Sequence, residues 1–558
     1  MRVPLPAPPE SSLPKVLDPE SDRVRAASPT VARLLATAVT DPSFGSTVAY
    51  DLIAELLDFA AACRLDYTTA LVAESMSASP STVRGSPDGT YVDEVPPPGV
   101  NIVDGMWIFR VKRPLGSPPA FKARYVARGF SERQGVNYFQ TFFPTPMMTT
   151  LRVLLHVVAQ RDYELHSLDF STAYLQGSLH ETTLAALGFV PSTADPSLFL
   201  RTDTLLPPFY VLVYVDDLGC ATADTEALTL VKSELQKRHT CTDLGELRSY
   251  LGLQMTRDRA RRTITLTQSH MVHQVLQRFG FQYSSPQLTP LSTSESLSAS
   301  PSDESVEPSG LYPELVGCLM YLMTCTRPDL AYPLSLLARY VAPGRHRKVH
   351  WDAAKRVLRY LCSLSGIGLV LGGRGPVVLT GQADASWVDD SATQRSSQGY
   401  TFSLGSGSIS WRSTRSSSVL SSSCEAEIYA GAMAAQELRW LTYLVTDLGE
   451  QPRSPPVLYV DNKAMIALCQ EHRLEHRTKH IALRYFLARE LQQRGQLCLA
   501  YVATRAKTAD VFTKALPHGD HQHFVTVLGL VPTLPHLLLD SACTVIYVYT
   551  CMLALARV

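Results

Sequence analysis

The sequence has no excess of either charge and none of the cysteine spacings that build zinc sites. Its 558 residues include 51 Lys and Arg against 51 Asp and Glu, which makes the formal net charge zero. Any surface for nucleic acid must therefore be local, because bulk charge neither favours nor excludes one. The 11 cysteines, scattered from Cys63 to Cys551, contain no CxxC pair. This usage fits a reducing compartment better than a disulfide framework or a zinc site.

Long apolar segments are missing too. The N-terminal letters MRVPLPAPPESS contain no apolar core for a secretory signal. Residues 542–556 are almost entirely apolar, but this run is shorter than the ~20 residues that span a bilayer. A buried or non-native tail explains it better than a membrane segment does. We expect an intracellular protein, cytoplasmic or nuclear, without a membrane partner.

Composition shifts divide the chain into segments. Hydrophobic residues make up 45% of it, which is enough to bury several cores. A stretch rich in Ser, Pro and Glu predicts a linker. The segments that we predict are a disordered and helical N-terminal remnant (1–98), a folded domain (99–283), the linker (284–310), a helical connection (311–372), a second folded domain (375–515) and a tail of unknown structure (516–558).

The spacing of apolar residues predicts an α/β architecture in both folded domains. In the first domain we expect a hairpin of residues 107–111 and 121–127, a helix at 149–160, strands at 165–170 and 210–215, and a helix from Asp224. In the second we expect strands at 377–383, 399–404 and 408–411, a long helix from Glu425, and strands at 457–460 and 497–502. Several helices are predicted between the two domains.

A first group of carboxylates follows two apolar strands of the first domain. Asp216 and Asp217 end the strand that contains Tyr214, and Asp169 ends another. Adjacent carboxylates repel each other, and a divalent cation relieves that repulsion. Magnesium prefers carboxylate and phosphate oxygens, and a pair of such ions can hold both oxygens of a phosphoryl displacement. A plain hairpin turn is the alternative reading of the adjacent aspartates.

A second group of carboxylates occurs at element ends of the second domain. Asp384 is expected to end a strand, Glu425 to open the long helix, Asp461 to end a strand and Asp510 to open a late helix. Convergent oxygens of this kind suit two magnesium ions and a phosphodiester. Each acid alone could have a purely structural role, since Asp often caps a helix. Glu427, on another face of the same helix, is the less favoured alternative to Glu425.

Longer motifs around both groups resemble Ty1/copia-type retrotransposon polyproteins. The strings NIVDGMWIFRVKR, FKARYVARGF, SLDFSTAYLQGSLHE, YVLVYVDDL and DLGELRSYLGLQM resemble the reverse transcriptase region. The strings ADASWVDD, STRSSSVLSSSCEAEIYA, LYVDNKAMIALCQ, HRTKHIALRYFLARE and YVATRAKTADVFTK resemble the RNase H region. The resemblance extends from about residue 101 to residue 530 and implies the last third of such a polyprotein. Motifs like those of its capsid, protease and integrase portions are not found.

The resemblance implies a fold and a chemistry. The fold is a ferredoxin-like palm with hairpin fingers, a helical thumb or connection, and an RNase H-like domain. The activities are RNA-directed DNA polymerase and RNase H, each with a two-ion magnesium site. The polymerase ligands would be Asp169, Asp216 and Asp217. The implied partners are an RNA template, a DNA primer, an RNA–DNA hybrid and deoxynucleoside triphosphates.

The resemblance also implies residues that contact substrate. Tyr174 would stack under the incoming sugar and exclude a 2′-hydroxyl, with a core aromatic as the alternative. Lys122 and Arg124 would hold the nucleotide phosphates, since positive groups stabilise the charge of a transferring phosphoryl. His480 and Arg484 would contact phosphate or assist product release. A solvated surface is the alternative for these four.

One departure from the family pattern bears on activity. Family members carry a sizeable stretch, with a YGLKQ-like motif, between the string LQGSLHE and the segment that resembles LGFVPSTADPSLF. Here only a few residues separate these two segments, which shortens the first domain near residues 181–188. The nucleotide pocket would therefore lack a wall. Because catalysis needs reacting atoms held in near-attack geometry, we expect weak or absent polymerase activity. The alternatives are an RNase H-only nuclease and a non-catalytic retroelement relic.

Overall fold

The computed structural model describes residues 105–112, 120–127, 145–170, 179–201, 206–294, 297, 311–342, 344–390, 393–450, 454–470 and 487–533. The chain forms two compact units, residues 1–143 and 144–558, and each is described by itself. The predicted N-terminal remnant and the apolar stretch at residues 542–556 lie outside the described residues. No helix among the described residues is both long and apolar enough to cross a membrane.

The described part of the first unit is a β-hairpin. Strands β1 (Gly105–Lys112) and β2 (Ala120–Ala127) pair antiparallel, with Ile108 opposite Arg124. This confirms the hairpin that the alternating sequence predicts. Lys122 and Arg124 lie on β2, but the directions of their side chains are outside the described part of the structure.

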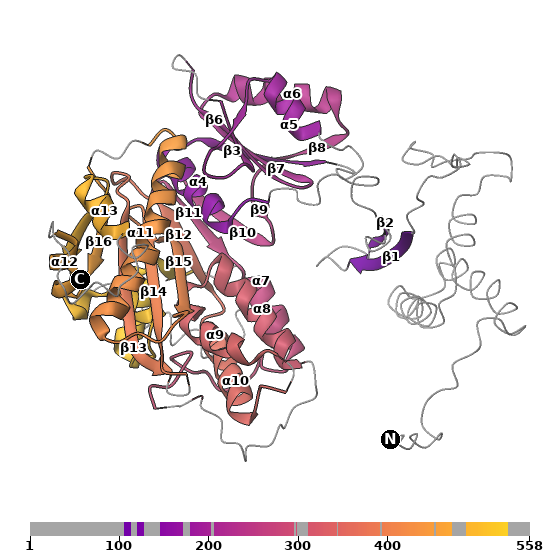
Figure 1. Ribbon diagram of the computed structural model, residues 1–558. Helices are drawn as coiled ribbons and strands as arrows, with labels where there is room; N and C mark the ends of the chain where they lie inside the picture. Colours follow the sequence, from indigo (N-terminus) through magenta and orange to yellow (C-terminus); the bar gives the residue numbers. More distant parts are fainter. Residues whose placement is uncertain are drawn as a thin grey trace, which may run out of the picture. The chain divides into compact units, whose positions relative to one another are not determined.

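The second unit contains an antiparallel sheet of six strands in the order β4-β5-β6-β7-β3-β8 (Figure 1). Its central strands carry the first group of aspartates, because β3 and β7 pair side by side. The strands are β3 (Glu164–Phe170), β4 (Val190–Pro191), β5 (Leu198–Arg201), β6 (Phe209–Tyr214), β7 (Asp217–Thr222) and β8 (Cys241–Glu246).

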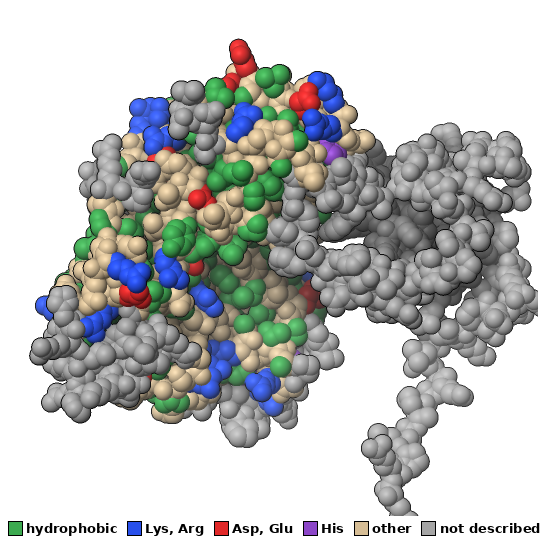
Figure 2. All heavy atoms as spheres, turned by 45° about the horizontal axis from the view of Figure 1, so that its top comes forward, with side chains coloured by type: hydrophobic (Ala, Val, Ile, Leu, Met, Phe, Trp, Pro, Cys, Tyr) green, Lys and Arg blue, Asp and Glu red, His purple; other side chains and the backbone are tan. Residues whose placement is uncertain are grey.

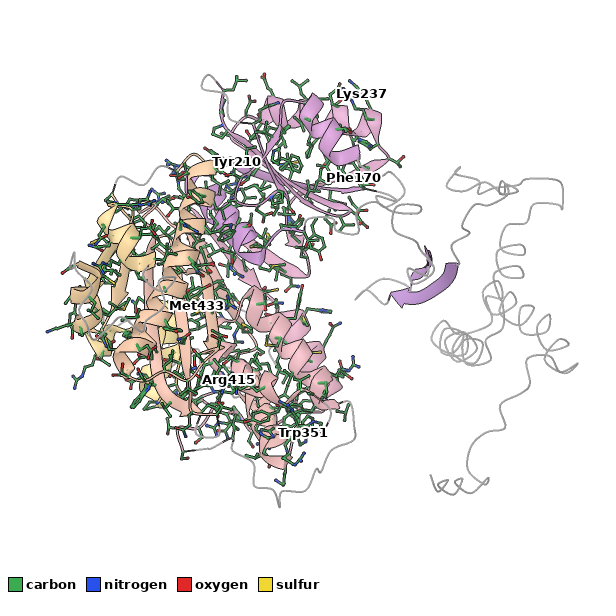
Figure 3. All side chains as sticks on the ribbon, viewed as in Figure 1. Phe170, Tyr210, Lys237, Trp351, Arg415 and Met433 are labelled. Carbon is green, nitrogen blue, oxygen red and sulfur yellow. The ribbon has the colours of Figure 1, made fainter. Side chains whose placement is uncertain are left out.

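Helices α5 (Leu179–Ala186) and α6 (Thr225–Arg238) cover one face of this sheet. α6 begins where predicted, because the carboxylate of Asp224 accepts hydrogen bonds from the second and third N–H groups of the helix at 3.0 and 2.9 Å. Phe170 belongs to the apolar cluster on this face, and Tyr210 belongs to the cluster on the opposite face (Figure 3). The sheet is therefore buried on both sides.

A second sheet joins segments that are far apart in the sequence. Helix α4 (Met148–Arg161) packs against it, and its residues 150–160 are all buried. The sheet order is β18-β12-β11-β10-β9. Its strands are β9 (Ser249–Tyr250), β10 (Leu253–Asp258), β11 (Thr263–Thr267), β12 (Ile367–Gly372) and β18 (Leu530–Pro532). The tail therefore returns through β18 and helix α14 (His518–Val527) to strands from both sides of the linker.

Most of the predicted helical connection (311–372) forms helices around an apolar core, and its last residues form strand β12. Helix α7 (Ser269–Arg278), from the predicted first domain, packs into the same core. The helices of the connection are α8 (Leu311–Cys325), η3 (Pro328–Leu330), α9 (Ala331–Leu337), η4 (Ala338–Tyr340) and α10 (Lys348–Ser363). Pro328 occupies the first position of η3, where its missing N–H removes no hydrogen bond. The buried Arg327 pairs with Asp329 at 2.6 Å, and this carboxylate also accepts from Tyr360.

The third sheet has the order β15-β14-β13-β16-β17, with three antiparallel strands followed by two that run parallel to β13. This is the strand order of an RNase H-like fold, as expected. Its elements are β13 (Thr380–Asp390), β14 (Arg395–Ser403), β15 (Ser408–Arg415), α11 (Ser423–Asp447), β16 (Val457–Val460), α12 (Lys463–Gln470), α13 (Leu487–Gln493), β17 (Cys498–Tyr501), η7 (Thr504–Ala506) and η8 (Thr508–Phe512).

Two placements differ from the sequence-based expectation. Asp384 lies inside β13 rather than at its end, because the strand continues to Asp390 across an irregularity after Ser386. Asp510 lies in the short 3₁₀ segment η8 and not at the start of an α-helix. Neither shift moves these acids away from the face of the sheet where the other carboxylates gather.

Candidate metal centre

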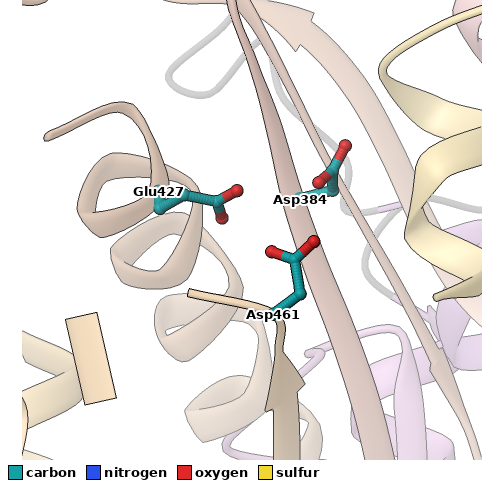
Figure 4. Close-up of side chains that lie close together, drawn as sticks. All are labelled: Asp384, Glu427 and Asp461. Atoms are coloured by element: carbon teal, nitrogen blue, oxygen red, sulfur yellow. The ribbon is translucent and has the colours of Figure 1, made fainter. Parts of the chain in front are cut away.

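Three carboxylates from separate elements converge beside the third sheet. Asp384 comes from β13, Asp461 follows β16, and Glu427 comes from α11. An oxygen of each lies within 4.8 Å of an oxygen of the others. β16 pairs in parallel with β13, which places Asp461 beside the strand that carries Asp384. Figure 4 shows the three side chains pointing toward one another.

Glu427, and not Glu425, belongs to this cluster, so the structure favours the alternative residue over the one that the sequence analysis prefers. The carboxylate of Glu425 accepts hydrogen bonds from the backbone N–H and the hydroxyl of Ser421 at 2.7 and 2.6 Å. Its own N–H donates to Ser422, the N-cap of α11. Glu425 therefore closes the helix terminus, and Glu427, two positions along, faces the sheet. The S-x-x-E spacing from Ser422 is a capping signature that could have identified this role.

Asp510 approaches the cluster because η8 packs closely on the sheet. Asp384 lies opposite Gly399 on β14. A Cβ at Gly399 would lie 2.4 Å from the Cβ of Phe512, so only glycine permits this approach. Thr513, just after η8, donates to the second carboxylate oxygen of Asp384. The result is a fourth carboxylate held next to Asp384.

The acids of the cluster are electrostatically strained. Burial, together with the charges of Asp384 and Asp461, raises the pKa of Glu427 to about 8. Burial and the charge of Asp384 raise the pKa of Asp510 to about 6, although Lys514 pairs with Asp510 at 2.9 Å. Glu427 Oε2 and Asp510 Oδ1 are buried without a hydrogen-bond partner. Unsatisfied buried carboxylate oxygens in this number fit a hard divalent cation such as magnesium.

A lysine that the sequence-based prediction missed lies inside the cluster. The ammonium of Lys507 lies 2.5 Å from Asp384 Oδ1, 2.5 Å from Asp461 Oδ1 and 3.6 Å from Glu427 Oε1. The side chain is fully buried. Burial alone would lower the pKa of Lys507, but the charges of Asp384 and Glu427 outweigh it and raise this pKa above its ordinary value.

The aspartates Asp169, Asp216 and Asp217 of the six-stranded sheet lie on or next to the paired strands β3 and β7. Asp169 on β3 lies directly opposite Asp217 on β7. The N–H of Phe170 donates to the carbonyl of Asp216 at 2.8 Å, so the turn that carries Asp216 closes onto β3. Burial, and then the charges of Asp169 and Asp216, raise the pKa of Asp217. The three carboxylates are thus close enough to repel one another.

The turn between β6 and β7 holds Val215 at φ +53°. This left-handed conformation is unfavourable for a β-branched residue. The hydroxyl of Tyr250 donates to the carbonyl of Asp217 at 3.2 Å and supports the turn from below. Among the described acids, however, only Asp384, Glu427 and Asp461 form a group of three whose oxygens all lie within 4.8 Å of one another. Asp169, Asp216 and Asp217 lie on neighbouring backbone segments, but their carboxylate oxygens do not form such a group.

The remaining predicted contact residues are not all visible. Tyr174, His480 and Arg484 lie outside the described residues, and for Lys122 and Arg124 only the strand is described. Figure 2 shows Lys and Arg side chains dispersed over the face in view rather than gathered in one continuous patch. This agrees with the balanced charge of the sequence.

Known proteins resemble the chain over most of its length. The family described as "Reverse transcriptase (RNA-dependent DNA polymerase)" matches residues 90–185 and 179–293. The Retrovirus-related Pol polyprotein from transposon RE2 of Arabidopsis thaliana is 33% identical over 484 residues, which are 79% of this chain and 33% of RE2. A transposon Ty5-1 protein of Saccharomyces cerevisiae is 30% identical over 46% of this chain and 82% of its own length.

Among solved structures, the foamy viral protease-reverse transcriptase in complex with an RNA/DNA hybrid matches with a TM-score of 0.40 and 13% identity, over 77% of this chain and 51% of that protein. The chain spans about a third of the length of RE2. The sequence motifs, the family match and the transposon relatives agree. The chain belongs to the family of Ty1/copia-type retrotransposon Pol polyproteins, of which it contains the reverse transcriptase and RNase H region.

Proposed function

We propose that the segment around the third sheet is a magnesium-dependent RNase H that cleaves the RNA strand of an RNA–DNA hybrid. The observation that carries this proposal is the convergence of Asp384, Glu427 and Asp461 within 4.8 Å, with Asp510 beside them. Asp384, Glu427, Asp461 and Asp510 would hold the magnesium. Bound magnesium would supply positive charge that activates water and stabilises the departing oxygen of the phosphodiester.

The residues of the chain prepare this site before any substrate binds. Asp384 is fixed by Thr513 and by the strand ladder of β13 and β14. Glu427 is fixed by α11, whose N-terminus is closed by Ser422 and Glu425. Asp461 lies at the end of a central strand. Rigid placement of ligands on three different elements is what a two-ion phosphodiesterase site requires.

A paired substitution in the full chain tests this function. Glu427→Gln should lower magnesium-dependent cleavage of the RNA strand in a labelled RNA–DNA hybrid by about 100-fold, because one ligand is lost. Glu425→Gln is the matched control and should stay within about threefold of wild type, since its carboxylate serves the helix terminus. The reverse order of effects, or unchanged cleavage in both variants, would contradict the proposed site.

We propose in addition that the six-stranded sheet is the palm of an RNA-directed DNA polymerase, with Asp169, Asp216 and Asp217 as magnesium ligands. Its substrates would be an RNA template, a DNA primer and deoxynucleoside triphosphates. Tyr174, Lys122 and Arg124 would contact the nucleotide, and His480 and Arg484 the hybrid near the nuclease site. The opposition of Asp169 and Asp217 supports this assignment.

Polymerase activity should nevertheless be weak. The reverse transcriptase family matches in two pieces that overlap at residues 179–185, where the sequence lacks the stretch that forms a wall of the nucleotide pocket. The aspartates are also less tightly gathered than those of the nuclease site. An RNase H-only protein is therefore the second candidate function, and a shortened nucleotide pocket is the reason for it.

Two assays on one preparation separate these functions. We expect wild-type protein to extend a primer on an RNA template no faster than an Asp216→Asn variant, while both cleave the hybrid. Asp461→Asn should abolish cleavage. Robust DNA synthesis by the wild type would overturn the predicted impairment. A folded protein inactive in both assays would instead indicate a non-catalytic relic.

A further inference from the structure

The interior of the carboxylate cluster contains a cation that belongs to the chain itself. The ammonium of Lys507 contacts two of the three gathered carboxylates at 2.5 Å and lies 3.6 Å from the third. The same three residues are the ones whose oxygens come within 4.8 Å of one another. Magnesium binds oxygen at about 2.0–2.1 Å, so opposed ligands of one ion lie roughly 4 Å apart. The position between these three carboxylates therefore holds either the ammonium or one divalent ion, and not both at once.

The surrounding structure fixes the position of the Lys507 side chain. This side chain is fully buried, whereas η7 immediately before it is exposed. The backbone N–H of the next residue, Thr508, donates to the side chain of Gln382 on β13 at 2.6 Å. This bond anchors the segment against the sheet and directs the lysine stem inward. An unpaired charge at this depth would be costly, and the carboxylates compensate it.

The charges explain why an internal cation is useful here. Four carboxylates, Asp384, Glu427, Asp461 and Asp510, surround the site, and Lys514 pairs with Asp510 alone among them. Without a cation, the like charges would push β13, β16 and α11 apart. An ammonium in the centre holds these elements in the arrangement that a divalent ion needs. The ammonium carries one positive charge, whereas a divalent ion carries two. In its presence Glu427 Oε2 and Asp510 Oδ1 still have no hydrogen-bond partner.

We infer that Lys507 is a built-in competitor for the divalent cation: its ammonium occupies the central position among Asp384, Glu427 and Asp461, and it must withdraw before a divalent ion binds there. Lys507 thereby sets the affinity of the nuclease site for metal and preserves the site when metal is absent. The inference rests on the proposed function for the identity of the ion, but its test measures metal binding and not hydrolysis.

The test is a Mn²⁺ titration of the full chain by calorimetry without nucleic acid. Lys507→Gln should bind Mn²⁺ at least about tenfold more tightly than wild type at the cluster, because the competing charge is gone. Arg505→Gln is the matched control: it removes a positive charge two residues away that is exposed, and it should change the affinity by less than about twofold. Adding Asp461→Asn to Lys507→Gln should remove the gain, which locates the ion. Equal or weaker binding by Lys507→Gln would overturn the inference.

Wild-type protein provides a second readout that does not depend on folding of the variant. Lys507 should resist an amine-acylating reagent in the absence of divalent ions and become several-fold more reactive at saturating Mn²⁺, as followed by mass spectrometry. Lys237, an exposed lysine on α6, reports the activity of the reagent. Continued protection of Lys507 at saturating Mn²⁺ would refute withdrawal. If Lys507 behaves as expected while hybrid cleavage is absent, the proposed function fails and the competition stands.

Discussion

His156 makes the stability of the protein depend on pH in a defined window. It lies in the buried helix α4, and its Nδ1 accepts a hydrogen bond from the N–H of Gly372 on β12 at 3.1 Å. Nε2 is buried without a hydrogen-bond partner. Burial lowers the pKa of His156 from its ordinary value of 6.5 to about 4. The folded protein therefore holds this imidazole neutral at pH values where the unfolded chain protonates it.

The sign and size of the effect follow from this shift. Because the folded pKa is depressed, the stabilisation is fully present above pH 6.5 and is lost as pH falls toward 4. The whole shift corresponds to about 3 kcal/mol, of which about 2 kcal/mol disappears between pH 7 and pH 5. His521 has a similarly lowered pKa of about 4 and adds a parallel loss, so the wild type alone cannot isolate His156.

His156→Asn isolates it, because the Asn oxygen replaces Nδ1 as the acceptor for Gly372 and does not titrate. Urea unfolding of wild type and variant at pH 7 and pH 5 gives four free energies of unfolding. The wild type should lose about 2 kcal/mol more than the variant between the two pH values. A difference below about 0.5 kcal/mol would refute the burial of a neutral imidazole at this position.

Three further substitutions test the fold and the site. Gly399→Ala should lower hybrid cleavage by about 100-fold, because the added Cβ would meet Phe512 at 2.4 Å and displace the segment that carries Asp510; cleavage near wild type would contradict the close approach. Arg152→Met should destabilise the protein by about 3 kcal/mol in urea unfolding, since three backbone carbonyls lose their donor. Asp224→Ala should lower the unfolding free energy by about 1 kcal/mol through the lost N-cap of α6, and an unchanged value would exclude the cap.

Local patterns predicted the elements well, and the reason is physical. The helix at residues 149–160 is long enough to show a helical spacing, and the short apolar runs at 210–215 and 457–460 are rich in β-branched and aromatic residues, which favour strands. Elements α4, β6 and β16 confirm these predictions. Strand ends were less predictable. β13 continues past Asp384 because β14 keeps pairing with it, and pairing is a property of the fold rather than of the strand alone.

The composition of the cluster could be predicted only in part. Asp384, Asp461 and Asp510 carry a signal because each lies next to a recognisable apolar or helical segment, although Asp384 lies inside β13 and Asp510 inside η8. The choice between Glu425 and Glu427 depends on which way α11 faces the sheet, and two residues of helix amount to more than half a turn. Lys507 carries no local signal at all. Its position follows from the hydrogen bond between Thr508 and Gln382, which are 126 residues apart. The local sequence around Lys507 cannot predict a contact at that separation.

The carboxylate cluster depends on the six-stranded sheet for support. α11 carries Glu427 near its N-terminus, and its C-terminal end is held by that sheet. Tyr210 donates to the carbonyl of Leu448 at 2.7 Å, and Trp440 donates to the carbonyl of Ala194 at 2.9 Å. Ser192 donates to Asp447 at 2.6 Å. The six-stranded sheet therefore fixes the helix from which Glu427 projects, so the proposed loss of polymerase activity would be compatible with retention of the fold of this segment.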